Sequence, residues 1–285
     1  MKNIIRIITD SASDMPADYR SDVTVVPLHV RFGTEEYLDG VNLTHMEFYE
    51  KLIENDELPT TSQVAPYAFE EQYEKAREAG EQVIVITISG KLSGTYQSAC
   101  IASADYEDMV RIVDSENVTV GERTLVEYAI RLKDEGMDAD AIVEILNTAK
   151  KNIRVVGLLD TLEYLKKGGR ISKATALVGG MLSIKPVIAI ENGEVVMLGK
   201  ARGSKQGNNL LVQQIEKAGG IDFSKPYYLG YAGLDDTLLR KYITDSAHLW
   251  EAHADKLDIM SVGGAIGTHV GPGAIAVAFF EKSNV

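Results

Sequence analysis

Loops rich in serine, threonine and glycine follow several predicted strands of this sequence and offer hydroxyl and backbone N–H donors to a ligand. The most prominent loop spans residues 89–95, Ser-Gly-Lys-Leu-Ser-Gly-Thr, after an apolar run at 83–88. Comparable loops occur at residues 10–14, 60–63 and 114–115. Such donors bind anions at helix N-termini, although serine and threonine also serve there as ordinary caps. Because parallel strands end at one edge of a sheet, several such loops together favour a binding site there.

Three residues of the second half carry candidate binding groups beside or close to glycine. Arg170 lies in a Gly-Gly-Arg run and Arg202 in Ala-Arg-Gly, so a tight turn can present each guanidinium. An alternative interpretation of Arg170 is a structural ion pair between the two halves of the chain. His269 precedes Val-Gly-Pro-Gly and can hydrogen-bond a ligand near neutral pH. Its alternative is a buried histidine bonded to a backbone carbonyl.

Standard catalytic and metal-binding motifs do not occur in the sequence. There is no Gly-x-x-x-x-Gly-Lys-Ser/Thr phosphate loop, and no Gly-x-Gly-x-x-Gly follows the first predicted strand. Lys91 stands where a nucleophile elbow at Ser93 would need glycine. His248 and His253 are one residue too far apart for a helical zinc pair, and Cys100 is the only cysteine. We therefore expect no catalytic residue, no metal and no cofactor.

The acidic composition narrows the classes of partner. The 285 residues are 45% hydrophobic and 25% charged, which is typical of a folded protein. Lys and Arg number 29 and Asp and Glu 42, giving a formal charge of −13. A surface this acidic repels phosphate backbones, so nucleic-acid binding is not expected. The single cysteine and a start without signal-peptide character predict a cytoplasmic location.

Short β-branched runs alternate with longer helical patterns, which predicts an α/β fold. Several of the runs are apolar throughout, as in strands buried on both faces. The expected strands are residues 4–9, 25–30, 83–88, 110–113, 155–159, 185–190, 195–198, 227–231, 259–262 and 274–280.

Helix ends are marked by capping residues. Residues 44–47, Thr-His-Met-Glu, form a capping-box pattern. Pro66 can open the next helix and Gly80 can end it. Two further helices are expected at residues 118–135 and 139–150.

The end of the last of these helices predicts a division into two α/β lobes. Residues 1–153 would form an N-terminal lobe with a mostly parallel sheet that carries the hydroxyl loops. Residues 154–285 would form a C-terminal lobe with a mixed sheet, because Asn192-Gly193 between two apolar runs indicates a β-hairpin. A cleft between lobes is a common place for a ligand.

The motifs, taken in order, resemble those of the DegV family. The resemblance covers nearly the whole chain, from Asp10 to the C-terminal strand. The matching segments are residues 61–63, 89–99, 168–171, 185–186, 200–203 and 269–273. In one departure from the family pattern, Gly230-Tyr231 stands where Gly-His is common, far from the hydroxyl loops.

This resemblance implies two α/β lobes with a tunnel between them for one long-chain fatty acid. Carried over by position, Thr61 and Ser93 would hydrogen-bond the carboxylate, and His269 would complete that site. Arg170 and Arg202 would lie near the mouth, where Arg202 corresponds to a residue linked to a partner. The residues of the supporting loops would be Ser62, Gly94, Thr95 and Gly271.

The partners are implied by the same resemblance. In FakB-type members of the family, an ATP-dependent, FakA-like kinase phosphorylates the bound acid, and the acyl phosphate enters phospholipid synthesis. The chain would then be a carrier subunit and not itself an enzyme, in transient contact with a membrane or an acyltransferase. Two alternatives stay open: a stand-alone hydrolase with Ser93 as nucleophile and His269 as base, and a phospho-ligand binder using the hydroxyl loops.

Physical chemistry agrees with a lipid ligand held by neutral groups. Burial contributes about 0.8 kcal/mol per CH₂, so roughly fourteen methylenes supply on the order of 10 kcal/mol. The head group then needs only a few hydroxyl donors to offset its desolvation. Neutral donors also leave a carboxylate oxygen more nucleophilic than a tight bidentate arginine would.

Overall fold

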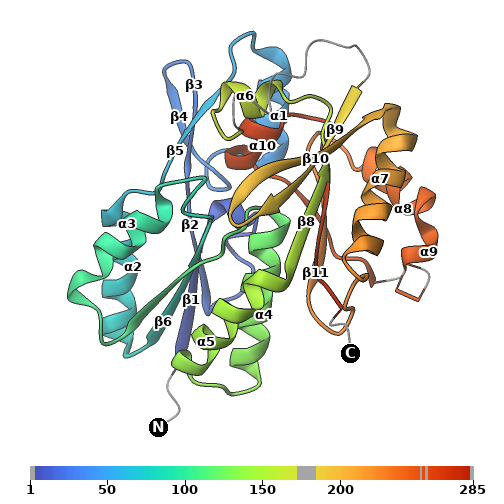
Figure 1. The fold of residues 1–285 in the computed structure, drawn as a ribbon. Coiled ribbons are helices and arrows are strands. Elements are labelled where there is room, and N and C mark those ends of the chain that lie inside the picture. Colours follow the sequence, from blue (N-terminus) through green and yellow to red (C-terminus); the bar gives the residue numbers. More distant parts are fainter. Residues whose placement is uncertain (1–3, 172–183, 251, 254–255, 283–285) are drawn as a thin grey trace.

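Four parallel strands form the first sheet of the computed structural model (Figure 1), in the order β2-β1-β6-β7. These strands are β1 (Ile5–Asp10), β2 (Val23–Val26), β6 (Gln82–Thr87) and β7 (Val110–Asp114). The central pair, β1 and β6, is buried almost throughout, as its apolar sequence predicts. The structure describes residues 4–171, 184–250, 252–253 and 256–282.

Six strands form a second, mixed sheet from the second half of the chain. Its order is β10-β9-β8-β13-β11-β12, and only β11 and β12 pair in parallel among the described pairs. The strands are β8 (Ile153–Leu158), β9 (Ile184–Glu191), β10 (Glu194–Arg202), β11 (Tyr227–Tyr231), β12 (Ile259–Ser261) and β13 (Ile275–Phe280). The predicted hairpin joins β9 to β10, with Asn192 and Gly193 at φ 50° and 81° as its turn requires.

A small antiparallel sheet, β4-β3-β5, differs from the prediction. It consists of β3 (His29–Phe32), β4 (Glu35–Leu38) and β5 (Thr60–Ser62). The single strand predicted at residues 25–30 is therefore wrong, because the chain leaves the first sheet at Pro27, which has no N–H for a ladder. Leu28 donates its N–H to Ser11 Oγ instead, at 3.0 Å. The hydroxyl-rich loop predicted at residues 60–63 is largely a strand.

Helices pack on the outer sides of the two large sheets and between them. In Figure 1, α2 and α3 lie outside the first sheet, α7 and α8 outside the second, and α4 lies between the two sheets. The helices are α1 (His45–Glu54), α2 (Pro66–Ala79), α3 (Thr95–Ala102), α4 (Val120–Asp134), α5 (Ala139–Ala149), α6 (Glu163–Lys167), α7 (Gly203–Lys217), α8 (Thr237–Asp245), α9 (Ala247–Trp250) and α10 (Gly264–Val270). None of the helices in the described ranges is long and apolar enough to span a bilayer.

The predicted helix ends are confirmed. At the start of α1, Thr44 Oγ1 accepts from the N–H of Glu47 at 3.2 Å, and Glu47 Oε2 accepts from the N–H of Thr44 at 2.8 Å. Helix α2 begins at Pro66 and ends at Gly80, whose φ of 67° suits glycine. Helices α4 and α5 lie within the two ranges that the sequence predicts.

Buried side chains form two hydrophobic cores. The larger core combines residues from both halves of the chain, with α4 packed against strands of both sheets. The smaller core lies between the mixed sheet and its outer helices, where Trp250, Tyr242 and Phe279 are fully buried. Strand β8 contributes to both, because Val155 faces the larger core and Val156 the smaller.

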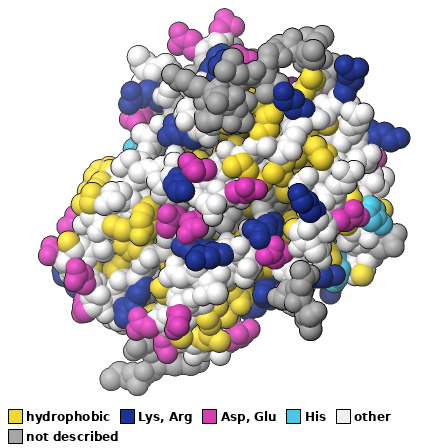
Figure 2. Space-filling view, viewed as in Figure 1, with side chains coloured by type: hydrophobic (Ala, Val, Ile, Leu, Met, Phe, Trp, Pro, Cys, Tyr) yellow, Lys and Arg dark blue, Asp and Glu magenta, His cyan; other side chains and the backbone are white. Residues whose placement is uncertain are grey.

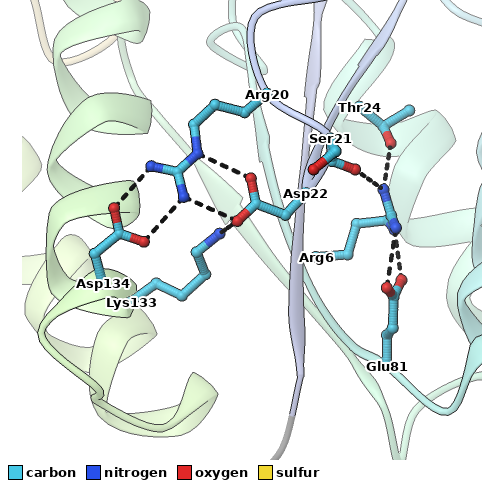
Figure 3. Close-up of polar contacts among 8 residues, drawn as sticks. All are labelled: Arg6, Arg20, Ser21, Asp22, Thr24, Glu81, Lys133 and Asp134. Carbon is cyan, nitrogen blue, oxygen red and sulfur yellow. Dashed lines mark hydrogen bonds and ion pairs between the residues drawn. The ribbon is translucent and has the colours of Figure 1, made fainter.

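Charged side chains of both signs are interspersed on the surface (Figure 2). One network joins the start of β2 to the end of α4 (Figure 3). Arg20 donates to Asp22 Oδ1 at 2.9 Å and to Asp134 Oδ2 at 2.7 Å, and Lys133 also contacts Asp22. Arg20 and Lys133 hold the pKa of the Asp22 carboxyl well below its usual range. These partly exposed pairs stabilise the fold only modestly.

Candidate functional site

A deep cavity is bounded by residues from both halves of the chain. The empty space within it, counted together with its open mouth, is about 940 Å³. The first half contributes β5 and the loops that follow β6 and β7, and the second half contributes α10, one face of β8 and residues of β9 and β13.

Aliphatic side chains make up most of the cavity wall. The alternation of side chains along β8 explains part of it, because Val155, Gly157 and Leu159 face the cavity while Val156 and Leu158 pack in the smaller core. Other aliphatic wall residues are Leu28, Ile88, Leu92, Val118, Leu165, Ile188, Ala189, Ile190, Val195, Val262, Ala265, Ile266, Val270, Ala274, Ile275 and Ala276. Such a wall suits an apolar chain.

Most of the polar groups that line the cavity come from the predicted site. The structure brings together Thr61 and His269, whose Oγ1 and Nε2 atoms are 2.8 Å apart although the two residues are far apart in sequence. The polar wall residues are Thr61, Ser62, Gln63, Ser93, Thr119, Arg170 and His269. Five of them, Thr61, Ser62, Ser93, Arg170 and His269, are residues that the sequence singles out.

His269 is held as a neutral imidazole. Burial, with a smaller contribution from the charge of Arg170, lowers the pKa of His269 to about 4. Its Nδ1 is buried without a hydrogen-bond partner among the described residues and lies against the Cα of Gly168, where a Cβ would come within 2.1 Å. A proton on Nε2 leaves only a lone pair unpartnered at Nδ1. In that tautomer Nε2–H donates to Thr61 Oγ1, and the Thr61 hydroxyl proton is available to a ligand.

The Ser93 loop is positioned by its neighbours. Ser93 Oγ lies 2.9 Å from Thr95 Oγ1, and the N–H of Val64 donates to Thr95 Oγ1 at 3.3 Å. Gly94 permits the close approach of Gln63, since a Cβ would lie 1.9 Å from Gln63 Oε1. Gly94 and Thr95 therefore support the loop from behind and are not among the wall residues of the cavity.

The two predicted arginines lie in different places. Arg170 lines the cavity and donates to Gly168 O at 2.6 Å and to Leu92 O at 3.2 Å. Among the described residues, Arg170 therefore makes hydrogen bonds to the backbone and no ion pair between the halves. Arg202 is exposed at the end of β10 and is not among the cavity wall residues.

Gly271 has a structural reason to be glycine. Its φ is 70°, and a Cβ would lie 2.3 Å from Cδ2 of Tyr164 in α6. It supports the end of α10 and does not line the cavity.

Sequence reasoning missed two polar wall residues. Gln63 stands inside the Thr-Ser-Gln motif and could have been included on that ground. No sequence pattern marked Thr119 as a wall residue. Its side chain reaches the wall through a backbone φ of 48°, which is rare for a β-branched residue and is not expected from its type. The N–H of Thr119 donates to Ala12 O at 2.9 Å, and its hydroxyl donates to Asp14 Oδ2 at 2.6 Å.

The hydrolase arrangement is not formed in this structure. Ser93 Oγ pairs with Thr95, while the ring of His269 pairs with Thr61 and, within the described ranges, contacts no carboxylate. A nucleophile, base and orienting acid are therefore not aligned. The part of the chain that the structure describes also contains no group of three His, Cys, Asp or Glu side chains able to hold a metal.

The fold and the cavity match one family of α/β proteins. Residues 4–282 match the family model described as "Uncharacterised protein, DegV family". The chain belongs to the DegV family, as the motifs predict. A DegV domain-containing protein of Caldanaerobacter subterraneus is 35% identical over 283 residues, which cover 98% of this chain and 99% of the relative. One from Deinococcus radiodurans is 33% identical over 280 residues, 96% and 97% of the two chains.

Solved structures with the same fold come from fatty-acid-binding members of the family. A fatty-acid-binding DegV protein of Thermus thermophilus has a TM-score of 0.85 at 33% identity, covering 97% of this chain and 99% of its own. The fatty-acid-binding DegV protein of Streptococcus agalactiae has 0.86 at 27%, with coverage of 99% and 100%. A stearic-acid-binding protein of Eubacterium ventriosum has 0.84 at 26%, with coverage of 98% and 99%. The predicted α/β fold, parallel in the first half and mixed in the second, is thereby confirmed.

Proposed function

We propose that this chain binds one long-chain fatty acid, with the tail in the aliphatic cavity and the carboxylate at Thr61, Ser93 and His269. The observation that carries the proposal is a cavity with an aliphatic wall whose polar lining includes hydroxyls and a neutral imidazole. The fatty acids bound by similar proteins of the family support it.

The polar groups suit a carboxylate that must stay reactive. The Thr61 hydroxyl has a free proton once His269 donates to its oxygen. Arg170 already uses two of its donors on backbone oxygens, so its guanidinium is not arranged for a bidentate grip on the ligand. Tail burial at about 0.8 kcal/mol per CH₂ then provides most of the affinity.

We further propose that the chain is a carrier which presents the bound acid to an ATP-dependent, FakA-like kinase. The kinase would transfer a phosphoryl group to the carboxylate and form an acyl phosphate for phospholipid synthesis. Arg202 is exposed outside the cavity, which suits contact with a partner rather than with the lipid tail. Residues 1–153 would supply the head-group loops, and residues 154–285 would close the cavity around the tail.

The lipid content of the purified protein tests the first step. The protein is purified from a bacterial host, extracted with organic solvent and analysed by mass spectrometry against its molar concentration. We expect about one long-chain acid per chain, as one cavity requires. An extract without lipid, together with esterase activity that disappears in Ser93→Ala, would overturn the proposal in favour of a hydrolase.

A further inference from the structure

The N-terminal end of α10, the helix that carries His269, is fixed by side chains from the first half of the chain. The N–H of Gly263 donates to Asp14 Oδ1 at 2.7 Å, and the N–H of Gly264 donates to Asp39 Oδ1 at 2.8 Å. Both aspartates are buried, with exposed fractions of 5% and 2%. The first free N–H groups of α10 are thus satisfied by two distant carboxylates, since Gly263 has no side chain to cap the helix.

Two further contacts hold the strand that leads into α10. His45 Nδ1 lies 2.7 Å from Ser261 Oγ, and Tyr49 Oη donates to Val262 O at 3.0 Å. Each of these contacts joins α1, or the residue that begins it, to the segment between β12 and α10. The junction of residues 261–264 is therefore fastened to the first half of the chain at four successive residues.

The glycines of the junction allow this close approach. A Cβ on Gly263 would lie 2.9 Å from Asp14 Oδ1 and 2.7 Å from His45 Nε2. A Cβ on Gly264 would lie 3.1 Å from Asp39 Oδ1. Larger residues would push the carboxylates away from the helix end that they bind.

The composition of α10 makes these end contacts decisive for its position. The helix reads Gly-Ala-Ile-Gly-Thr-His-Val, so few large side chains anchor it before His269. Gly267 packs closely on α1, with Phe48 Cε1 only 2.5 Å from where a Cβ would be. Because the helix is short and hydrogen-bonded along its length, a shift at Gly264 moves the imidazole of His269 as well.

We propose that Asp14 and Asp39 are positioning residues, which hold α10 so that His269 meets Thr61 at the head-group end of the cavity. Neither aspartate is among the lining residues of the cavity, so each acts through the groups that it hydrogen-bonds, first of all the N-terminal end of α10. Asp14 has a second link to the site, since it also accepts from the hydroxyl of Thr119, a wall residue. The inference rests on the proposed function, because it concerns how the carboxylate site is held in place.

The test measures head-group recognition separately from tail binding. Affinities for palmitate and for methyl palmitate are compared in the wild type, Asp14→Ala, Asp39→Ala and Asp39→Asn. The ester keeps the tail and lacks the charged head. We expect Asp14→Ala and Asp39→Ala to lower the preference for the acid by about tenfold or more, as loss of a hydrogen bond to a charged group does. Asp39→Asn keeps an acceptor oxygen for Gly264 and should retain most of the preference.

Asp138→Ala is the matched control for loss of a helix cap. Asp138 accepts from the N–H of Ala141 at 2.9 Å at the start of α5, and it is exposed and not among the cavity wall residues. This variant should lose stability and keep the preference for the acid. The ring nitrogen resonances of His269, assigned with His269→Gln, should shift in the two Asp→Ala variants and stay unchanged in Asp138→Ala.

A milder variant covers the case in which the alanine variants do not fold. Gly264→Ala keeps both aspartates and displaces the helix end by the contact of its Cβ with Asp39 and with Phe48 Cδ2 at 3.0 Å. A folded variant of Asp14, Asp39 or Gly264 with the wild-type preference and unshifted His269 resonances overturns the inference. A wild type that binds neither palmitate nor its ester overturns the proposed function instead.

Discussion

Replacing Thr61 by valine removes one hydroxyl from the head-group site and leaves the shape of the side chain almost unchanged. The structure places this hydroxyl 2.8 Å from His269 Nε2 and on the cavity wall. Thr61→Val should therefore weaken the binding of the carboxylate and leave the tail contacts as they are. The variant separates the two contributions on which the proposed function depends.

The size of the effect follows from one lost hydrogen bond to a charged group. Such a bond is worth about 1.5–3 kcal/mol, or about a 10- to 150-fold change in Kd. Affinity for the methyl ester should change by less than about threefold, since the ester makes no comparable charged contact. The gain per added CH₂, about 0.8 kcal/mol, should be the same in both proteins.

Competition with a fluorescent fatty acid measures both ligands over a series of chain lengths. Thr60→Val is the matched control, because Thr60 is the preceding residue of β5, is exposed and does not line the cavity. The reasoning is refuted if Thr61→Val weakens acid and ester equally, or if it changes the dependence on chain length. Either result would place the hydroxyl along the tail and away from the carboxylate.

Three other predictions concern pH, the partner and the backbone. The pKa of His269, about 4 against an ordinary 6.5, means that the unfolded chain binds more protons between these values. The contribution of His269 to the free energy of unfolding should therefore decrease as the pH falls from about 6.5 to about 4, by up to about 3 kcal/mol. His269→Gln should remove this contribution, so its loss of stability relative to the wild type should be smaller at pH 4.5 than at pH 7 in urea titrations. Arg202→Ala should keep its bound acid, measured by mass spectrometry, and lose phosphorylation by the kinase; equal loss of both would contradict a partner role. Gly271→Ala should lower the free energy of unfolding by at least about 1–3 kcal/mol, because Cβ meets Tyr164 at positive φ, and an unchanged urea midpoint would contradict the strain.

The sequence predicted those helices and turns whose ends are determined by the residue types at the ends themselves. Pro66 and Gly80 bound α2, and Asn192-Gly193 forms the hairpin turn, because each residue type restricts the backbone itself. The sheet β4-β3-β5 could not be predicted this way. Its strand β5 is a short run of polar residues, Thr60–Ser62, and becomes a strand only by pairing with β3, far away in sequence.

The candidate site was predictable only where motifs carried it. Thr61, Ser93 and His269 came from the ordered family motifs, and the structure adds the contact between Thr61 and His269 that spacing could not show. Thr119 was out of reach, because tertiary hydrogen bonds to Ala12 and Asp14 impose a backbone angle that threonine avoids locally. The position of such a residue in the site is determined by tertiary contacts and cannot be predicted from its residue type.

Strand β8 lies between the cavity and the smaller core, so a ligand in the cavity would affect the stability of the folded protein. Its cavity face belongs to the larger hydrophobic core, while Val156 and Leu158 on the other face belong to the smaller one. A fatty acid in the cavity would complete the packing of that larger core, and a tightly bound ligand stabilises the folded state in proportion to the logarithm of its concentration. If the chain binds a fatty acid as proposed, we expect the empty protein to be the form that proteases remove first, so that the cellular amount of the protein follows the supply of lipid.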